Sequence, residues 1–297
     1  QTEYLILELE KFQNKFYKNL NLIKLIKFYF EPLLQKYKWG INSYYYLAGK
    51  FGIHPTYIQE MINIKLSENK MLEGISQLKN YGASRYDVNL VRSEFQKPIK
   101  LKNGKWSPKS KMLRKEVLLV TSGPSLLDYK IEIENYISRF KPVVIALNSS
   151  TCINKKLIDF YVACNPLTLL SDIKKIKNSK KPIILPKSIL SKNIASKLKS
   201  LKILDYGVGM AENKFDILDK CARVPKLYTV AYALSVATSG QAKRILLAGF
   251  DGYGQDDRRT KIVDNLFYIY SSNKKAKQLL GITPSSYSFE TKSVYAL

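Results

Sequence analysis

Apolar residues recur along this chain with two different periods, and the period changes near residue 95. In the first part they lie three and four positions apart, which is the spacing of amphipathic helices. Four such segments follow one another, at residues 2–17, 21–37, 41–52 and 56–66. Gly52 is expected to end one helix and Pro55 to open the next. The pattern predicts a helical region over residues 1–95.

After Glu116 the chain alternates between short apolar runs and helical patterns. The runs are rich in leucine and β-branched residues, as expected of strands that are buried on both faces. They lie at residues 116–121, 143–147, 159–164, 182–186, 201–205 and 244–250, with a last candidate at residues 292–297. The alternation predicts an α/β fold over residues 116–297, with a doubly wound, mainly parallel, Rossmann-like sheet preceded by the small all-helical region.

Three stretches between these elements are interpreted from their composition. Residues 96–115 contain eight basic residues, no acidic residue and two prolines, which favours an exposed basic linker. The alternative is a strap over an anionic ligand or a membrane lipid. The lysine-rich residues 173–202 are expected to form a solvated surface. Residues 207–216 are expected to form a flexible loop over the strand ends, able to close on a ligand.

The formal net charge of +25 indicates an anionic partner. Lysine far outnumbers arginine, and the few arginines are scattered, so we expect a nucleotide, an anionic sugar or a membrane surface, and no nucleic acid. Three cysteines without CxxC spacing argue against a disulfide framework or a zinc site and favour the cytoplasm. Residues 21–39 are basic and aromatic, which is typical either of a helix lying on a membrane or of a plain packed helix.

Ligands of a doubly wound sheet bind outside the carboxyl ends of its strands. Polar residues follow four of the predicted strands: Ser122, Gly123, Pro124 and Ser125 after the first, Asn148 after the second, Asn165 after the third, and Asp251 and Tyr253 after the sixth. Gly123 allows close backbone approach, and the next helix N-terminus favours negative charge. The turn matches neither GxGxxG nor GxxxxGK[ST]. It predicts either a nucleotide site or simply a tight strand-to-helix turn.

Five short motifs carry a resemblance to a known family. TSGPSL, ALNSS, ACNPL, YTVAYALSVA and ILLAGFDGY occur in the order seen in the bacterial sialyltransferases that use CMP-activated sialic acid. The resemblance covers roughly residues 116–297. A related group, close to archaeal pterin pyrophosphokinases and to the flagellin-modifying Maf proteins, shares the Gly-Pro-Ser turn.

This resemblance implies a role for each strand-end residue. Gly123, Pro124 and Ser125 would hold the phosphate side of the donor, whereas Asn148 and Asn165 would contact its ribose, base or sugar. Ser122 and Asp251 are further donor-binding candidates. Thr229 would cap the helix that faces the donor, and Tyr253 would donate a hydrogen bond to the departing phosphate. The implied substrates are a CMP-activated ulosonic sugar and a glycan or lipid-linked acceptor. No further cofactor is required, and the implied setting is bacterial surface (lipopolysaccharide) biosynthesis at the inner membrane face.

The family's general base is a histidine, and here the chain departs from the pattern. His54, the one histidine, lies before a proline at a helix start in the first region, where a structural role is expected. Asp256 and Asp257 fall near the position of the family's histidine and are the candidate bases. An aspartate would need burial to act as an effective base. The alternative is an N-cap beside two arginines, which would leave the activity itself in doubt.

The first region resembles another family. QTEYLILELE and WGINSYYYLAGKFGIHPTYIQEM are similar to the tail of metal-dependent pyruvate aldolases of the 4-hydroxy-2-oxovalerate type. The catalytic Arg-Asp and the His-x-His metal ligands of those enzymes have no counterpart, so no aldolase activity is expected. The resemblance implies a natural fusion of an aldolase with the α/β domain, with this chain beginning inside the aldolase.

Two other functions remain open from the sequence. A pyrophosphokinase-like enzyme would need Mg²⁺, for which Asp251, Asp256 and Asp257 are the available carboxylates. A non-catalytic scaffold, in which the α/β domain regulates or tethers the aldolase, needs no ligand at all. The oligomeric state, including a homo-oligomer, is also left open.

Overall fold

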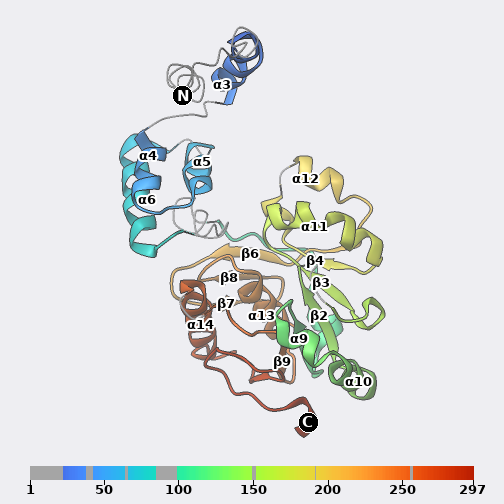
Figure 1. Cartoon of the computed structure of the whole chain (residues 1–297). Helices are drawn as coiled ribbons and strands as arrows, with labels where there is room; N and C mark the ends of the chain where they lie inside the picture. Colours follow the sequence, from blue (N-terminus) through green and yellow to red (C-terminus); the bar gives the residue numbers. More distant parts are fainter. Residues whose placement is uncertain are drawn as a thin grey trace. The chain divides into compact units, whose positions relative to one another are not determined.

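The computed structural model describes residues 23–37, 43–63, 66–84, 99–148, 152–190, 192–254 and 257–297. The chain divides into two compact units, Gln1–Tyr86 and Asp87–Leu297 (Figure 1). The helix expected at residues 2–17 lies outside the described residues.

The first unit is helical in its described parts. Its helices are η1 (Ile26–Phe30, a π-helical stretch), α3 (Glu31–Tyr37), α4 (Ser43–Lys50), α5 (Pro55–Asn63) and α6 (Glu68–Tyr81). Helix α4 packs against α5 and α6. Gly52 has a φ of 65° just after α4, as a C-terminal glycine should. His54 Nδ1 accepts a hydrogen bond from the amide of Thr56, so it caps α5.

The helix at residues 23–37 presents its apolar side chains to solvent. Phe28 and Tyr29 are 74% and 66% exposed, and Phe30 is 50% exposed. No residue of η1 is buried. None of the helices in the described ranges is long and apolar enough to cross a bilayer.

The second unit is built on a seven-stranded, all-parallel sheet. Its strands are β1 (Val117–Val120), β2 (Val143–Leu147), β3 (Phe160–Val162), β4 (Ile183–Ile184), β5 (Ile203–Leu204), β9 (Ile245–Ala248) and β10 (Leu279–Gly281). Their order is β10-β9-β1-β2-β3-β4-β5. Strands β2 and β9 both pair with β1 in parallel. The predicted α/β fold with a doubly wound parallel sheet is confirmed.

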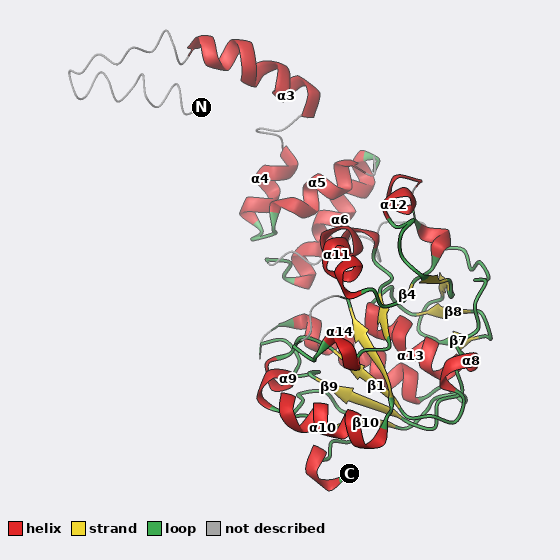
Figure 2. Cartoon of the chain, turned by 90° about the vertical axis from the view of Figure 1, so that its right-hand side faces the viewer, coloured by secondary structure: helices red, strands yellow, loops and turns green. Residues whose placement is uncertain are grey.

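Both faces of this sheet are covered, which explains its continuous apolar runs. Val117 and Leu119 pack on one face, and Leu118 and Val120 on the other, as the pleat requires. The first face is covered by α13 (Thr229–Ser239) and α14 (Arg258–Ser271). The second is covered by α9 (Pro124–Asp128), α10 (Lys130–Phe140), α11 (Pro166–Ser179) and α12 (Lys192–Lys197). Figure 2 shows β1 and β9 running between α13 and the α9–α10 pair.

The prediction of a flexible loop at residues 207–216 is wrong. A second sheet of three strands forms there, from β6 (Gly207–Met210), β7 (Asp216–Ile217) and β8 (Cys221–Val224). A Cβ on Gly207 would lie 1.9 Å from the carbonyl oxygen of Lys102, and one on Gly209 would lie 2.9 Å from Leu101. The two glycines therefore allow close backbone packing rather than flexibility.

The predicted basic linker is largely exposed over its described residues, 99–115, but it is also tied to the α/β unit. The carbonyl of Ile99 accepts from the amide of Met210, and the amide of Trp106 donates to Asp205. Met112, in α8 (Lys109–Met112), is fully buried in the core. Backbone hydrogen bonds and the buried Met112 therefore anchor the segment to the α/β unit, while its lysines stay exposed.

The C-terminal prediction of a strand at residues 292–297 is wrong as well. Val294–Ala296 forms a 3₁₀ helix (η4), which Ser293 caps by accepting from the amide of Tyr295 at 3.3 Å. The seventh strand is instead β10, a three-residue element that the sequence pattern does not reveal. The lysine-rich residues 173–202 form α11, β4, η3 (Lys187–Ile189) and α12, and their described lysines are mainly exposed, as expected.

One buried cluster predicts how stability depends on alkaline pH. The hydroxyl of Tyr136 donates to Glu116 at 2.7 Å, and the other oxygen of Glu116 pairs with Arg244 at 2.6 Å. Burial, with a smaller contribution from Glu116, raises the pKa of Tyr136 from 10.0 to about 12. The raised pKa favours the neutral phenol of the folded state, so its contribution to stability is present below pH 10 and is lost as the pH rises through about 12.

We therefore expect the free energy of unfolding in urea to fall between pH 10 and pH 12, and to fall less steeply in Tyr136→Phe. The control is Tyr268→Phe, because the Tyr268 side chain is 73% exposed. Equal slopes in the wild type and Tyr136→Phe would contradict the assignment.

Candidate functional site

The order in which strands are added to the parallel sheet reverses between β1 and β9. From β1 the chain adds β2 to β5 on one side, and it then returns to add β9 and β10 on the other. The connections at the carboxyl ends of β1 and β9 therefore diverge, and a crevice forms between them. A cavity of about 510 Å³ lies there, within the size range of small-molecule sites. We call it the switch-point cavity. It is lined by Thr121, Ser122, Gly123, Pro124, Leu147, Asn148, Tyr228, Thr229, Val230, Gly249, Phe250, Asp251, Gly252, Tyr253, Val263 and Tyr287.

The turn after β1 is tied to the loop after β9. The amide and the hydroxyl of Ser125 donate to the two carboxylate oxygens of Asp251, at 2.8 and 2.9 Å. Thr121 Oγ1 donates to the carbonyl of Gly249. The amide of Gly249 in turn donates to Thr283 at 2.9 Å. These contacts fix one wall of the cavity.

The Asp251 carboxylate consequently occupies the amino end of α9. The resemblance implies that Gly123, Pro124 and Ser125 hold a donor phosphate, yet the Ser125 donors are already bound to Asp251. Ser125 is only 4% exposed and does not line the cavity. Ser122, Gly123 and Pro124 do line it, so they can contact a ligand through their other atoms.

A second helix end also lines this cavity. Helix α13 begins at Thr229, and its N-cap residue, Tyr228, makes no side-chain capping hydrogen bond. The first-turn amides of a helix have no intrahelical acceptors and attract anions. Tyr228, Thr229 and Val230 all line the cavity. The amino end of α13 is therefore the place where this cavity can hold an anion.

Asn148 lies beside this helix end. It directly follows β2 with a φ of 58°, a left-handed conformation that asparagine tolerates better than most residues. Its Oδ1 accepts from Thr229 Oγ1 at 3.3 Å. Its Nδ2 group has no partner among the described residues and remains available to a ligand. Asn165 does not line the cavity, because it is 4% exposed and immediately precedes α11.

Of the described candidate catalytic residues, Tyr253 lines the cavity and Asp257 does not, although Arg259 contacts both. Tyr253 lines the cavity, and the guanidinium of Arg259 lies 4.2 Å from the centre of its ring. Asp257 does not line the cavity. It caps α14 by accepting from the Arg259 amide at 2.9 Å and forms an ion pair with the Arg259 guanidinium at 2.6 Å. This is the alternative that the sequence left open for Asp257. Asp256 lies outside the described residues.

Several lining residues were not among the candidate site residues of the sequence analysis. Tyr228, Phe250, Val263 and Tyr287 give the cavity an apolar and aromatic part, and Tyr287 comes from a loop after β10. Burial raises the pKa of the Tyr287 hydroxyl, which therefore stays protonated and can donate a hydrogen bond. Aromatic residues are so frequent in this chain that composition does not mark Tyr228, Phe250 or Tyr287 as site residues.

The charge of the cavity differs from that of the whole chain. Despite the net charge of +25, no lysine, arginine or histidine lines it in the part of the chain that the structure describes, and Asp251 is its one carboxylate there. No group of three or more histidine, cysteine or acidic side chains suited to a metal ion is found among the described residues. Binding here would rest on neutral donors and on the α13 helix end.

No model of a protein family matches this chain, and no curated protein matches it either.

Proposed function

We propose that the α/β unit is a glycosyltransferase-like domain that binds a CMP-activated ulosonic sugar in the switch-point cavity. The observation that carries this proposal is the amino end of α13, where no N-cap side chain makes a capping hydrogen bond. This helix end lies beside Asn148 at the point where the strand order reverses. Open α/β sheets bind nucleotides at this point. The proposed setting is the assembly of bacterial surface polysaccharide, with a glycan or lipid-linked acceptor.

The motifs that suggest this family also meet in space. TSGPSL, ALNSS, YTVAYALSVA and ILLAGFDGY each supply residues that line the one cavity, although they are far apart in the sequence. ACNPL is the exception, because Asn165 does not line the cavity. Four separate segments that converge on one site support the resemblance more strongly than the short motifs do alone.

In this proposal the donor phosphate binds at the amino end of α13, where the first-turn amides and Asn148 Nδ2 donate to its oxygens. Asp251 accepts hydroxyl groups of the ribose or the sugar with its remaining lone pairs. The Tyr253 hydroxyl donates to the phosphate oxygen that leaves, which stabilises the charge developing there. Asp251 would also act as the general base that accepts the acceptor's proton, since it is the one carboxylate among the described lining residues.

The resemblance of the first unit extends the proposal to a natural fusion with a pyruvate aldolase. Such aldolases make 2-keto acids, and ulosonic sugars are 2-keto acids, so the two activities would belong to one pathway. This part of the proposal rests on analogy between families.

Thermal unfolding in the presence of different nucleotides tests the proposal. Free ligand at 100 times its dissociation constant adds about 2.7 kcal/mol to stability. We expect CMP to raise the unfolding temperature without Mg²⁺, and CDP, UDP, GDP and ATP to have less effect. A shift with ATP and Mg²⁺ alone would favour a pyrophosphokinase-like enzyme. No shift with any nucleotide would favour a scaffold.

Substitution of Asn148 tests the phosphate position. Asn148→Gly removes the amide group yet keeps a residue that adopts the left-handed backbone without strain. We expect it to weaken CMP binding about tenfold, the value of one hydrogen bond to a charged group. Asn148→Asp should weaken binding further, because it sets a negative charge beside the phosphate.

The control is Asn178→Ala, since Asn178 is exposed on α11. Titration calorimetry with CMP measures all four proteins. Wild-type affinity in Asn148→Asp would contradict the proposed phosphate position.

A further inference from the structure

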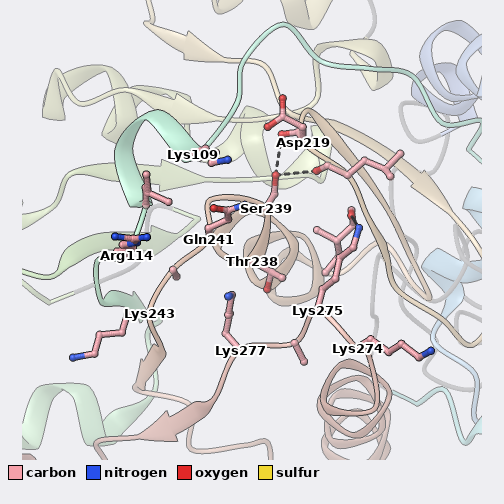
Figure 3. Close-up of a pocket in the computed structure, with 15 residues that line it drawn as sticks. Lys109, Arg114, Asp219, Thr238, Ser239, Gln241, Lys243, Lys274, Lys275 and Lys277 are labelled. Atoms are coloured by element: carbon pink, nitrogen blue, oxygen red, sulfur yellow. Dashed lines mark hydrogen bonds between the residues drawn. The ribbon is translucent and has the colours of Figure 1, made fainter.

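A second cavity, of about 1040 Å³, lies at the other end of the parallel sheet (Figure 3). It is found beside the residues that precede β9, whereas the switch-point cavity lies beside the residues that follow β9. Its walls come from α8 and the residues after it, from the end of β7, from the last turn of α13, and from the connection between α14 and β10. We call it the amino-end cavity.

Positive charge distinguishes the amino-end cavity from the switch-point cavity. Six basic residues line it, namely Lys109, Arg114, Lys243, Lys274, Lys275 and Lys277. Its one acidic lining residue, Asp219, accepts a hydrogen bond from Ser107 at 2.6 Å. None of the six basic residues forms an ion pair with another described residue. These charges are therefore not neutralised by the surrounding protein.

The side chains are arranged around a common space. Figure 3 shows the ammonium groups of Lys109 and Lys277 on the inner side of the cavity, whereas those of Lys243 and Lys274 point outward from its edges. Lys275 is the exception, because its Nζ donates to the carbonyl of Ile217 at 2.7 Å. Basic residues from separate segments, 109–114, 243 and 274–277, thus line one cavity.

The backbone that carries these side chains is held in place. Arg114 and Gln241 both adopt a left-handed conformation, with φ values of 55° and 53°, which costs energy in residues other than glycine. The Arg114 amide donates to the carbonyl of Gln241 at 3.0 Å. The amide of Lys277 donates at 3.0 Å to Tyr270 OH, which is itself hydrogen-bonded to Thr238. The surrounding contacts therefore maintain a defined arrangement of the basic residues.

The fold itself accounts for only part of this charge. The carboxyl end of α13 lies at this cavity and carries roughly half a negative charge, which one lysine would balance. The carboxylate of Asp219 balances a second positive charge. A surplus of about four positive charges remains around the cavity, and like charges gathered on one surface repel one another unless an anion binds among them.

We propose that the amino-end cavity binds an anion that carries more than one phosphate group. A single phosphate has at most two negative charges, fewer than the surplus here. The volume exceeds what one phosphate fills, and Arg114 offers the planar fork that suits phosphate oxygens. The proposal is independent of the nucleotide assignment, because the two cavities share no lining residue.

The phosphate groups can belong to a free polyphosphate or to the headgroups of an anionic membrane. Leu113 and Leu218 line the cavity and are 44% and 41% exposed, so a lipid surface would find apolar contacts beside the lysines. The two sources share one chemistry and are separated by the choice of probe: tripolyphosphate in calorimetry, and vesicles of phosphatidylcholine with or without phosphatidylglycerol in sedimentation.

The test compares two triple variants that lose the same charge. The first, Lys109→Gln with Lys243→Gln and Lys277→Gln, removes lysines of the cavity. The matched control, Lys174→Gln with Lys175→Gln and Lys199→Gln, removes exposed lysines elsewhere on the α/β unit. A double variant, Lys109→Gln with Lys243→Gln, changes only exposed side chains and serves if the first triple variant fails to fold.

We expect the cavity variant to bind tripolyphosphate, or vesicles containing phosphatidylglycerol, at least about tenfold more weakly than the wild type, with the control within about twofold. A difference with tripolyphosphate identifies a free ligand as the source, and a difference confined to vesicles identifies the membrane. Equal losses in the two triple variants would show diffuse attraction and overturn the proposal. So would unchanged binding in the cavity variant, or no binding of either probe by the wild type.

Discussion

Replacing Gly123 with alanine is expected to destabilise the α/β unit by about 3 kcal/mol or more and to abolish nucleotide binding. A Cβ at this position would lie 1.8 Å from Asp251 Oδ2 and 2.1 Å from the carbonyl oxygen of Gly249. The φ and ψ of Gly123, −62° and 149°, are accessible to alanine, so space and not backbone conformation demands glycine. Relief of the clash would require the turn after β1 to move away from the loop after β9.

Gly254→Ala is the matched control, because a Cβ there would have no atom within 4 Å and the residue lies in the same loop as Asp251. Urea unfolding gives the stability of both variants, and calorimetry gives their affinity for CMP. Wild-type stability in Gly123→Ala would mean that the turn and the loop are not held together as described.

Removal of the Asp251 carboxylate is expected to cost about 3 kcal/mol of stability, the second large effect. Asp251→Ala leaves the amide and the hydroxyl of Ser125 without acceptors, in a residue that is 4% exposed. Ser125→Ala removes only the hydroxyl, so a smaller loss is expected. In the double variant the losses should not add, and the coupling energy should be about 1–2 kcal/mol in favour of the pair.

Ser138→Ala provides the comparison for this double-mutant cycle. Ser138 is exposed on α10, and its hydroxyl donates to the carbonyl of Glu134. It shares no hydrogen-bond partner with Asp251 in the described structure. Its effect should add to that of Asp251→Ala within about 0.5 kcal/mol. If the Ser125 and Asp251 effects also add, the carboxylate does not hold the turn.

The main sheet could be predicted because its strands are buried on both faces. Val117–Val120 and Val143–Leu147 are uninterrupted apolar runs. Between helical segments, short runs of this kind predict strands that are buried on both faces. Strand β10 was missed because Leu279–Gly281 is too short to show a period. Strand β6 was missed because Gly207 and Gly209 suggest a loop, although their lack of side chains lets residues 101–102 approach.

The site could be predicted only at the level of strand ends. Gly123, Asn148 and Asp251 follow parallel strands, and topology alone brings them to one edge. Their contacts with one another could not be predicted, because the Ser125–Asp251 hydrogen bonds join residues 126 positions apart. The sequence left two roles open for Asp257, a base or an N-cap beside arginines, and only the structure shows that it caps α14 and pairs with Arg259.

Hydrogen–deuterium exchange with and without saturating CMP is the most direct test of the central claim, that the nucleotide binds in the switch-point cavity. The account predicts slower exchange in three segments, residues 121–126, 228–232 and 249–254, with the largest change at the start of α13. No change is expected at residues 109–114 and 238–243, which line the amino-end cavity. Protection confined to those latter residues, or absent from residues 228–232 while CMP is bound, would contradict the account.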